Sequence, residues 1–167
     1  HRQSVRYSRQ ALDLGVHDGR ALTMLADILG KSEDHGGARV AYEKAIRLDP
    51  GIAAHHCNYA SVLRIEGRTD EAAEELQTCI ELDATHCKAH WILSSLKRQT
   101  PEDNHIRRLE EVRQTSLLND EGRILIDFAL SKEYEDIGMY EKSFTCLAHG
   151  CNLKRNSIDY DVEQDTV

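Results

Sequence analysis

The chain has 167 residues, a formal net charge of −8, 40% apolar and 5% aromatic residues, and two prolines. This length is enough for one domain with a core, and the low aromatic content means that aliphatic side chains and Ala must build it. A binder of nucleic acid or of an anionic membrane surface needs a basic face. The negative charge therefore argues against both classes of partner, and the rarity of proline favours helix.

Five cysteines form an odd set without close pairs, which favours free thiols in a reducing compartment over disulfides. No apolar stretch approaches the roughly 20 residues of a membrane span, and no signal peptide is visible. We therefore expect a cytoplasmic location and no membrane partner. Because the chain begins with His1 and ends in an acidic segment, residues 158–167, we interpret it as a piece of a longer protein whose acidic tail leads toward a missing C-terminal domain.

Small and apolar residues recur at steps of 34 along the first half of the chain. The columns are Leu14, Leu48 and Leu82; Ala11, Ala45 and Cys79; Leu12, Ile46 and Ile80; and Ala26, Ala60 and Ser94. A period of about 34 residues is typical of an array of helical hairpins, in which each hairpin covers the apolar face of its neighbour. The pattern resembles tetratricopeptide (TPR) repeats and predicts an all-α, right-handed solenoid of antiparallel helix hairpins with about nine helices.

In chain order, the predicted solenoid covers residues 1–157. Its repeats are a partial one at 1–18, two regular ones at 19–52 and 53–86, a degenerate one at 87–120 and a last one at 121–157. Pro50 ends the second helix of the first regular repeat, and Gly67 marks the turn inside the next one. The segment from Thr100 to Asn104 interrupts the degenerate repeat as a loop, after which a helical stripe restarts at Ile106.

A narrower resemblance lies in the second half. Residues 89–94, 100–106, 128–132 and 152–155 are similar to the N-terminal solenoid of TPR-containing sulfotransferases. The resemblance implies that this chain is the non-catalytic, substrate-positioning part of such a protein, with its own C-terminal catalytic domain as one partner. The Gly-rich donor-binding loop of that family is absent from the chain, so the resemblance assigns no catalytic residue and no cofactor here.

The alternative is a stand-alone TPR adaptor that binds an extended peptide of a partner protein. In either case we expect the ligand in a concave groove lined by the first helices of successive repeats. Trp91 is the strongest candidate there, because Trp and Arg side chains often carry binding energy. The predicted lining residues are Arg20, Thr23, Asp27, Cys57, Ser61, Arg64, Trp91, Ser95, Arg98, Phe128 and Lys132.

Three groups of residues contain side-chain types that occur at catalytic or metal sites. His86, Cys87 and His90, with Cys79 nearby, have zinc-ligand chemistry, but His90 and Cys79 stand at packed positions of the repeat. Residues 30–32 lack the first Gly of a phosphate loop, and residues 55–57 are neighbours that point in different directions on a helix. We therefore expect no catalytic site and no metal.

The N-terminal helix lacks the partner helix of a complete repeat. Its apolar residues Leu12 and Leu14 therefore have no predicted cover on one side, and terminal repeats normally need a polar outer face. We expect self-association, where it occurs, to use this end of the chain.

Overall fold

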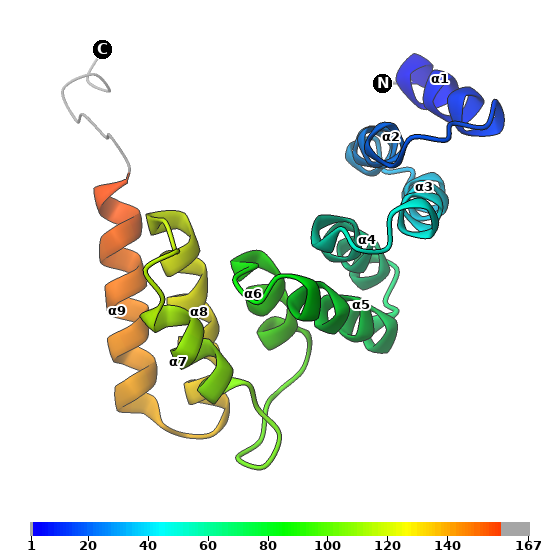
Figure 1. The fold of residues 1–167 in the computed structure, drawn as a ribbon. Coiled ribbons are helices and arrows are strands. Elements are labelled where there is room, and N and C mark those ends of the chain that lie inside the picture. The colour runs from blue at the N-terminus through cyan, green and yellow to red at the C-terminus, as the bar shows by residue number, and fades with distance from the viewer. Residues whose placement is uncertain (1, 158–167) are drawn as a thin grey trace. The chain divides into compact units, whose positions relative to one another are not determined.

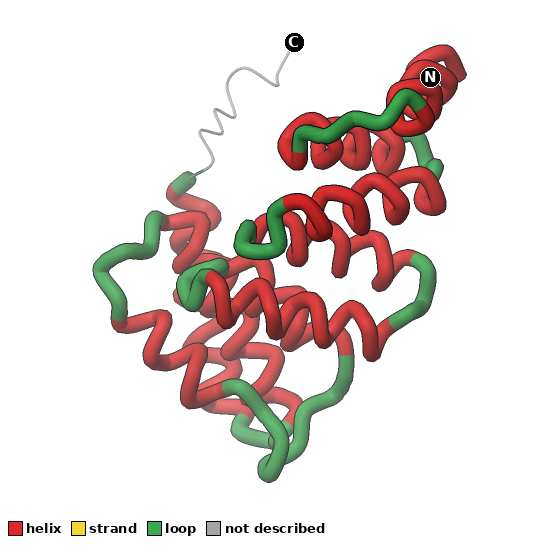
Figure 2. The backbone as a smooth tube through the Cα atoms, turned by 45° about the vertical axis from the view of Figure 1, so that its right-hand side comes forward, coloured by secondary structure: helices red, strands yellow, loops and turns green. Residues whose placement is uncertain are grey.

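The computed structural model describes residues 2–157, and over this range the chain forms nine helices and no strand (Figures 1 and 2). The predicted all-α class is confirmed. None of the helices in this range is both long and apolar enough to cross a membrane. The predicted acidic tail, residues 158–167, lies outside the described residues.

The chain divides into two compact units, which we call the first unit (residues 1–89) and the second unit (residues 90–167). Five helices belong to the first unit: α1 (Arg2–Asp13), α2 (Gly19–Lys31), α3 (His35–Leu48), α4 (Ala53–Ile65) and α5 (Thr69–Leu82). Consecutive helices pack against each other, most extensively within the hairpins α2–α3 and α4–α5.

Helix ends in the chain follow a repeated capping pattern. At the ends of α2, α4 and α8 (Asp120–Asp136), one residue takes a left-handed backbone conformation: Glu33 at φ 64°, Gly67 at φ 78° and Gly138 at φ 80°. The next backbone N–H then bonds five residues back, from Asp34 to Leu29, from Arg68 to Leu63 and from Met139 to Tyr134. The first two of these motifs lie 34 residues apart, so the repeat fixes the turn as well as the helices.

Small residues let the helices of each hairpin approach closely. Ala38 of α3 and its counterpart Ala72 of α5 are fully buried, as are Ala45 and its counterpart Cys79. A different periodic column is not buried: Leu14, Leu48 and Leu82 are 80%, 44% and 45% exposed. Each of them lies in or just after the last turn of the second helix of a repeat. Their side chains therefore lie beyond the interface between packed helices.

The N-terminal helix is held by polar contacts as well as by packing. Arg9 of α1 makes a two-pronged ion pair with Asp34, with distances of 2.6 and 2.7 Å. Lys44 of α3 donates to the backbone oxygen of Leu12 at 3.1 Å, and the Leu12 side chain is buried. The expected lack of cover at Leu12 is therefore wrong, whereas Leu14 is exposed, and self-association through this end stays a prediction.

The second unit contains most of α6 (Cys87–Leu96), then α7 (Ile106–Gln114), α8 (Asp120–Asp136) and α9 (Tyr140–Asn156). Helices α8 and α9 lie side by side along their length, with α7 against α8 (Figure 1). The predicted loop between α6 and α7 is closed on itself, since Thr100 and Asp103 exchange two hydrogen bonds at 3.0 and 3.1 Å.

Gly150 allows the close approach of α8 and α9. A Cβ atom at this position would lie 2.9 Å from Cε1 of Phe128 and 3.2 Å from Cβ of Asp127. Gly150→Ala should therefore destabilise the protein by about 1 to 3 kcal/mol through overpacking, despite the better helix propensity of Ala. Gly36→Ala is the matched control, because nothing lies within 4 Å of the added Cβ in α3.

Urea unfolding followed by circular dichroism tests this pair. The control should stabilise the protein by about 0.5 to 1 kcal/mol, so the two Gly→Ala changes are expected to shift the midpoint in opposite directions. Shifts of the same sign would show that Phe128 moves aside at little cost.

Candidate functional site

The predicted groove residues of α2 are engaged with neighbouring helices to different degrees. Arg20 is exposed, whereas Thr23 is half-buried. The Thr23 hydroxyl donates to the backbone oxygen of Gly19 at 3.0 Å and lies 3.0 Å from Nδ1 of His55 on α4. Asp27 accepts a hydrogen bond from the Tyr42 hydroxyl of α3. The side chains of Thr23 and Asp27 are therefore engaged in hydrogen bonds within the first unit, whereas the Arg20 side chain is exposed.

His55 connects α4 to α2, because its Nδ1 lies within hydrogen-bond distance of the Thr23 hydroxyl, at 3.0 Å. The ring is buried, and burial lowers its pKa. A neutral His55 thus bridges α2 and α4 as a structural contact.

On α4 the structure separates the predicted groove residues. Arg64 is exposed and Ser61 is half-buried, with its hydroxyl turned back to the Cys57 backbone oxygen at 3.0 Å. Cys57 is fully buried, so its assignment to the groove was wrong. Its thiol faces the second helix of its own hairpin, where Cys79 donates a hydrogen bond that lowers the pKa of Cys57.

Three residues with metal-ligand chemistry come together at this point. One ligand atom from each of Cys57, Cys79 and His86 lies within 4.8 Å of the other two. This group differs from the candidate set that the sequence suggested, which was His86, Cys87 and His90 with Cys79 nearby. Cys87 turns its sulfur to the backbone oxygen of Thr85 at 3.1 Å, and His90 is buried as expected for a packed position.

In the second unit, Trp91 is 39% exposed although it is a large aromatic residue. Its neighbours Ile92, Leu93 and Ser94 on α6 are all buried. Ser95 is exposed, one turn further along, and donates to the backbone oxygen of Trp91 at 2.8 Å. Since α6 ends at Leu96, the exposed Arg98 lies in the following loop and not on the helical face that was predicted.

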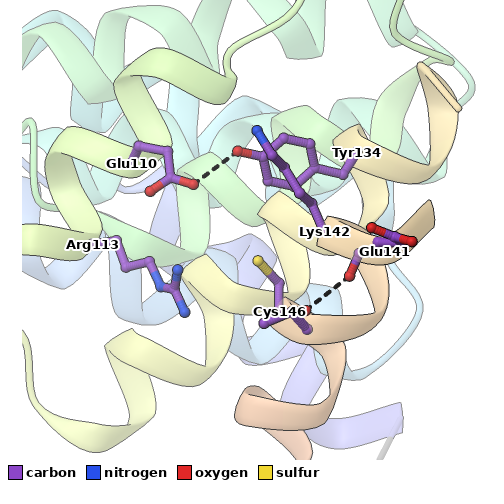
Figure 3. A pocket seen from close by; sticks show the side chains of 7 residues that line it. Glu110, Arg113, Tyr134, Glu141, Lys142 and Cys146 are labelled. Carbon is purple, nitrogen blue, oxygen red and sulfur yellow. Dashed lines mark hydrogen bonds between the residues drawn. The ribbon is translucent and has the colours of Figure 1, made fainter. Parts of the chain in front are cut away.

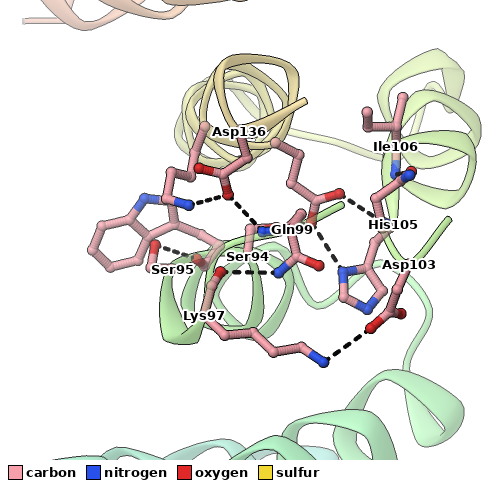
Figure 4. Close-up of polar contacts among 12 residues, drawn as sticks. Ser94, Ser95, Lys97, Gln99, Asp103, His105, Ile106 and Asp136 are labelled. Atoms are coloured by element: carbon pink, nitrogen blue, oxygen red, sulfur yellow. Dashed lines mark hydrogen bonds and ion pairs between the residues drawn. The ribbon is translucent and has the colours of Figure 1, made fainter. Parts of the chain in front are cut away.

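A buried polar cluster fixes α6 to α8 and to the start of α7 (Figure 4). The fully buried Glu133 accepts hydrogen bonds from the Ser94 hydroxyl at 2.6 Å and from the backbone N and Nδ1 of His105 at 2.6 and 3.0 Å. Burial alone would raise the pKa of Glu133, but the bonds from His105 and Ser94 outweigh it and lower the pKa. The orientation of Trp91 therefore rests on a rigid support.

The two predicted lining residues of α8 are less available than expected. Lys132 is half-buried and pairs with Asp136 one turn later, and Asp136 also accepts from the backbone N of Gln99 at 2.8 Å (Figure 4). Phe128 is half-buried against Gly150 of α9. Both side chains thus stabilise the second unit itself.

A surface pocket of about 320 Å³ opens between α7, α8 and α9 (Figure 3). Tyr134 donates to Glu110 at 2.9 Å, and the Lys142 ammonium lies 5.3 Å from the centre of the Tyr134 ring. Burial is the largest of the effects that raise the Tyr134 pKa to about 12. The pocket also contains Arg113 and Cys146, whose thiol pKa burial raises. A protonated thiol and a protonated phenol make a poor nucleophile and a poor base at neutral pH.

Residues 19–52 and 41–74 each match a sequence model of the tetratricopeptide repeat. The buried Ala26, Ala38, Ala60 and Ala72 and the caps at Glu33 and Gly67 fall within these residues. The chain contains TPR repeats.

Two curated Arabidopsis thaliana proteins are similar: the TPR repeat-containing thioredoxin TTL4, 28% identical over 93 residues, and the inactive TPR repeat-containing thioredoxin TTL3, 34% identical over 67. These matches span 56% and 40% of this chain but only 14% and 10% of the relatives.

Solved structures show the same fold at low sequence identity. MamA is 15% identical with a TM-score of 0.69, and the match covers 93% of this chain and 90% of that one. YrrB, described as a TPR protein with an unusual peptide-binding site, is 14% identical with a TM-score of 0.58 over 90% of this chain and 76% of that one. The TPR architecture therefore extends beyond the residues that the sequence models match.

Two features of the sites were not found from the sequence. The approach of Cys57 to Cys79 joins residues 22 positions apart on different helices, and the periodic pattern does not specify which side chains of a hairpin meet. The hydrogen bonds from His105 to Glu133 start at the end of the irregular loop that follows α6. The 34-residue register is lost in this loop. The sequence placed His86 beside Cys87 and His90, whereas the structure groups it with Cys57 and Cys79.

Proposed function

We propose that this chain is a non-catalytic TPR module that binds an extended peptide segment of a protein. The observation that carries the proposal is the 39% exposure of Trp91 on a helix whose next three residues are buried. An exposed Trp on a rigid support is the type of side chain that anchors a peptide, because it adds a large contact area with few rotatable bonds.

The surface around Trp91 favours a particular ligand chemistry. Ser95 lies one helical turn away, and the exposed Arg98 follows the helix end. Lys132 is half-buried and forms an ion pair with Asp136, whereas Arg98 is exposed and acts on the same carboxylate only as the smallest of the effects that lower the Asp136 pKa. We therefore propose a bound segment with one apolar or aromatic residue for Trp91 and an acidic residue for Arg98.

Two versions of this function remain. In the first, the module positions a substrate for a sulfotransferase-like domain that follows in the parent protein. In the second, it is a stand-alone adaptor in a reducing compartment such as the cytoplasm. The sequence that follows residue 167 in the parent gene separates them: a donor-binding loop there supports the first version, and a stop codon supports the second.

Peptide binding can be tested with Trp91 itself. Ligands selected from a displayed peptide library should shift the fluorescence of this residue, which is the single Trp of the chain. Trp91→Ala should weaken their binding by more than about 1 kcal/mol, roughly fivefold or more, with unchanged circular dichroism. Trp91→Phe is the matched control and should retain part of the affinity.

Two results would count against this function. If Trp91→Ala binds the selected peptides as well as the parent, the ligand lies elsewhere. If Trp91→Ala unfolds while Trp91→Phe does not, the ring serves the core rather than a ligand.

A further inference from the structure

We infer that Cys57, Cys79 and His86 form a binding site for one zinc ion inside the second regular repeat. The geometry is close to what zinc requires. Tetrahedral zinc with bonds of about 2.3 Å to sulfur holds two sulfurs roughly 3.8 Å apart. The three candidate ligand atoms already lie within 4.8 Å of one another, so shifts of less than about 1 Å bring them to ligand distances.

The three residues come from three consecutive segments of one unit. Cys57 belongs to α4, Cys79 to α5, and His86 to the turn between α5 and α6. Both helices are packed against each other by the hairpin, and the turn is held by the bond from His86 N to the Asp83 oxygen at 3.1 Å. The fold therefore holds the ligands close together before any metal arrives, which lowers the ordering cost of binding.

Hydrogen bonds within the group affect how its members would bind a metal. Nδ1 of His86 accepts a long hydrogen bond of 3.3 Å from the backbone N of Ala89. The same N–H also bonds to the His86 backbone oxygen at 2.9 Å, so the contact with the ring is the weaker of the two. The Cys57 thiol accepts a hydrogen bond from Cys79, which lowers the pKa of Cys57 and, together with burial, raises the pKa of Cys79. A bound cation would offset the cost of ionising Cys79, because it favours both thiolates. Metal binding would remove the proton from each thiol and release both protons to solvent.

The charge balance fits a buried position. A Zn²⁺ ion, two thiolates and one neutral imidazole sum to zero, and a neutral group of this kind avoids the large cost of burying a net charge. Both cysteines are fully buried and His86 is half-buried. The fourth coordination position is thus left to a water molecule on the side of His86.

The preceding repeat shows that the fold does not need these residue types. The positions 34 residues earlier hold Thr23 for Cys57, Ala45 for Cys79 and Ile52 for His86. The same hairpin packs there without any thiol or imidazole, and Ala45 is as buried as Cys79. Packing therefore explains a small residue at position 79, but it does not explain why all three positions carry ligand atoms in one repeat only.

The test uses the full chain without an affinity tag, reduced and freed of metal, with Co²⁺ as a spectroscopic probe. We expect one Co²⁺ per chain with sulfur-to-cobalt charge-transfer absorption, which added Zn²⁺ removes. Cys79→Ala restores the residue of the preceding repeat, so it should fold normally and bind more than about 100-fold more weakly. His86→Asn keeps an acceptor at the start of α6 and should weaken binding similarly.

Cys87→Ser is the matched control, because Cys87 adjoins His86 but turns its sulfur to Thr85. It should bind as the parent does, and Zn²⁺ should raise the melting temperature of the parent and of this control alone. The site would be refuted by a parent without charge-transfer absorption, or by unchanged binding in Cys79→Ala and His86→Asn. Loss of binding in Cys87→Ser would show that the ligands are a different set. The peptide test at Trp91 does not depend on any of these outcomes.

Discussion

Ala38→Glu and Ala72→Glu should each lower the free energy of unfolding by about 3 kcal/mol or more. Both side chains are fully buried where two helices of a hairpin meet. At Ala38 the Cβ already packs against α2, since a Cβ on Gly30 would lie in ordinary van der Waals contact with it, at 3.9 Å. A Glu side chain has no room there and no partner for its carboxylate, so the helices must separate or the carboxyl must be buried without a hydrogen bond.

Glu74→Ala is the matched control, because Glu74 is exposed on the same helix as Ala72. It should change stability by less than about 0.5 kcal/mol. Urea unfolding followed by circular dichroism measures all three variants. Equal midpoints would mean that the 34-residue alignment, which pairs Ala38 with Ala72, is wrong.

The periodic columns predicted the hairpins well because burial in a repeat array depends on regular neighbours. Ala26 and Ala60 are both fully buried, and α2 with α3 and α4 with α5 form two successive hairpins. The period alone does not measure burial, however. Leu48 and Leu82 repeat as faithfully as the alanines, yet both are exposed, because a helix end presents its last side chains beyond the seam.

The candidate groove was less predictable, since equivalent positions have different surroundings. Thr23, Cys57 and Trp91 stand 34 residues apart, but they are half-buried, fully buried and exposed respectively. A side chain small enough to fit between two helices enters the seam, as Cys57 does beside Cys79. An indole is too large for that space and remains outside. The repeat register therefore fixes the position of a residue on its helix. The size and the partners of the side chain decide whether it is buried between helices or exposed.

The largest effect in the second unit is expected at Glu133. Glu133→Ala should lower the free energy of unfolding by about 3 to 5 kcal/mol, as the loss of one partner from a buried pair does. The change removes the acceptor of three hydrogen bonds, from Ser94 and His105, and opens a cavity where no solvent reaches. Trp91 fluorescence reports this loss, because Trp91 is three residues from Ser94 and belongs to the same unit.

The control for this change is Glu135→Ala, which removes an exposed carboxylate from the same helix and should cost less than about 0.5 kcal/mol. Glu133→Gln keeps the shape of the side chain, but its amide NH₂ group would face the hydrogen-bond donors of Ser94 and His105. We therefore expect an intermediate loss of stability of about 1 to 3 kcal/mol. If the Ala variant were as stable as the parent, the hydrogen bonds of Glu133 would make no net contribution to the free energy of unfolding.

The pH dependence of unfolding gives a second, independent signature of Glu133. Its pKa in the folded protein lies below the ordinary value of 4.5, so the folded state binds this proton less readily than the unfolded state does. The stabilisation is therefore fully present above pH 4.5 and declines as the pH falls through the folded pKa. In Glu133→Gln this titrating group is absent, so stability should fall less steeply with acid than in the parent. Identical slopes in urea unfolding series below pH 4.5 would show that Glu133 is not the group that His105 and Ser94 hold ionised.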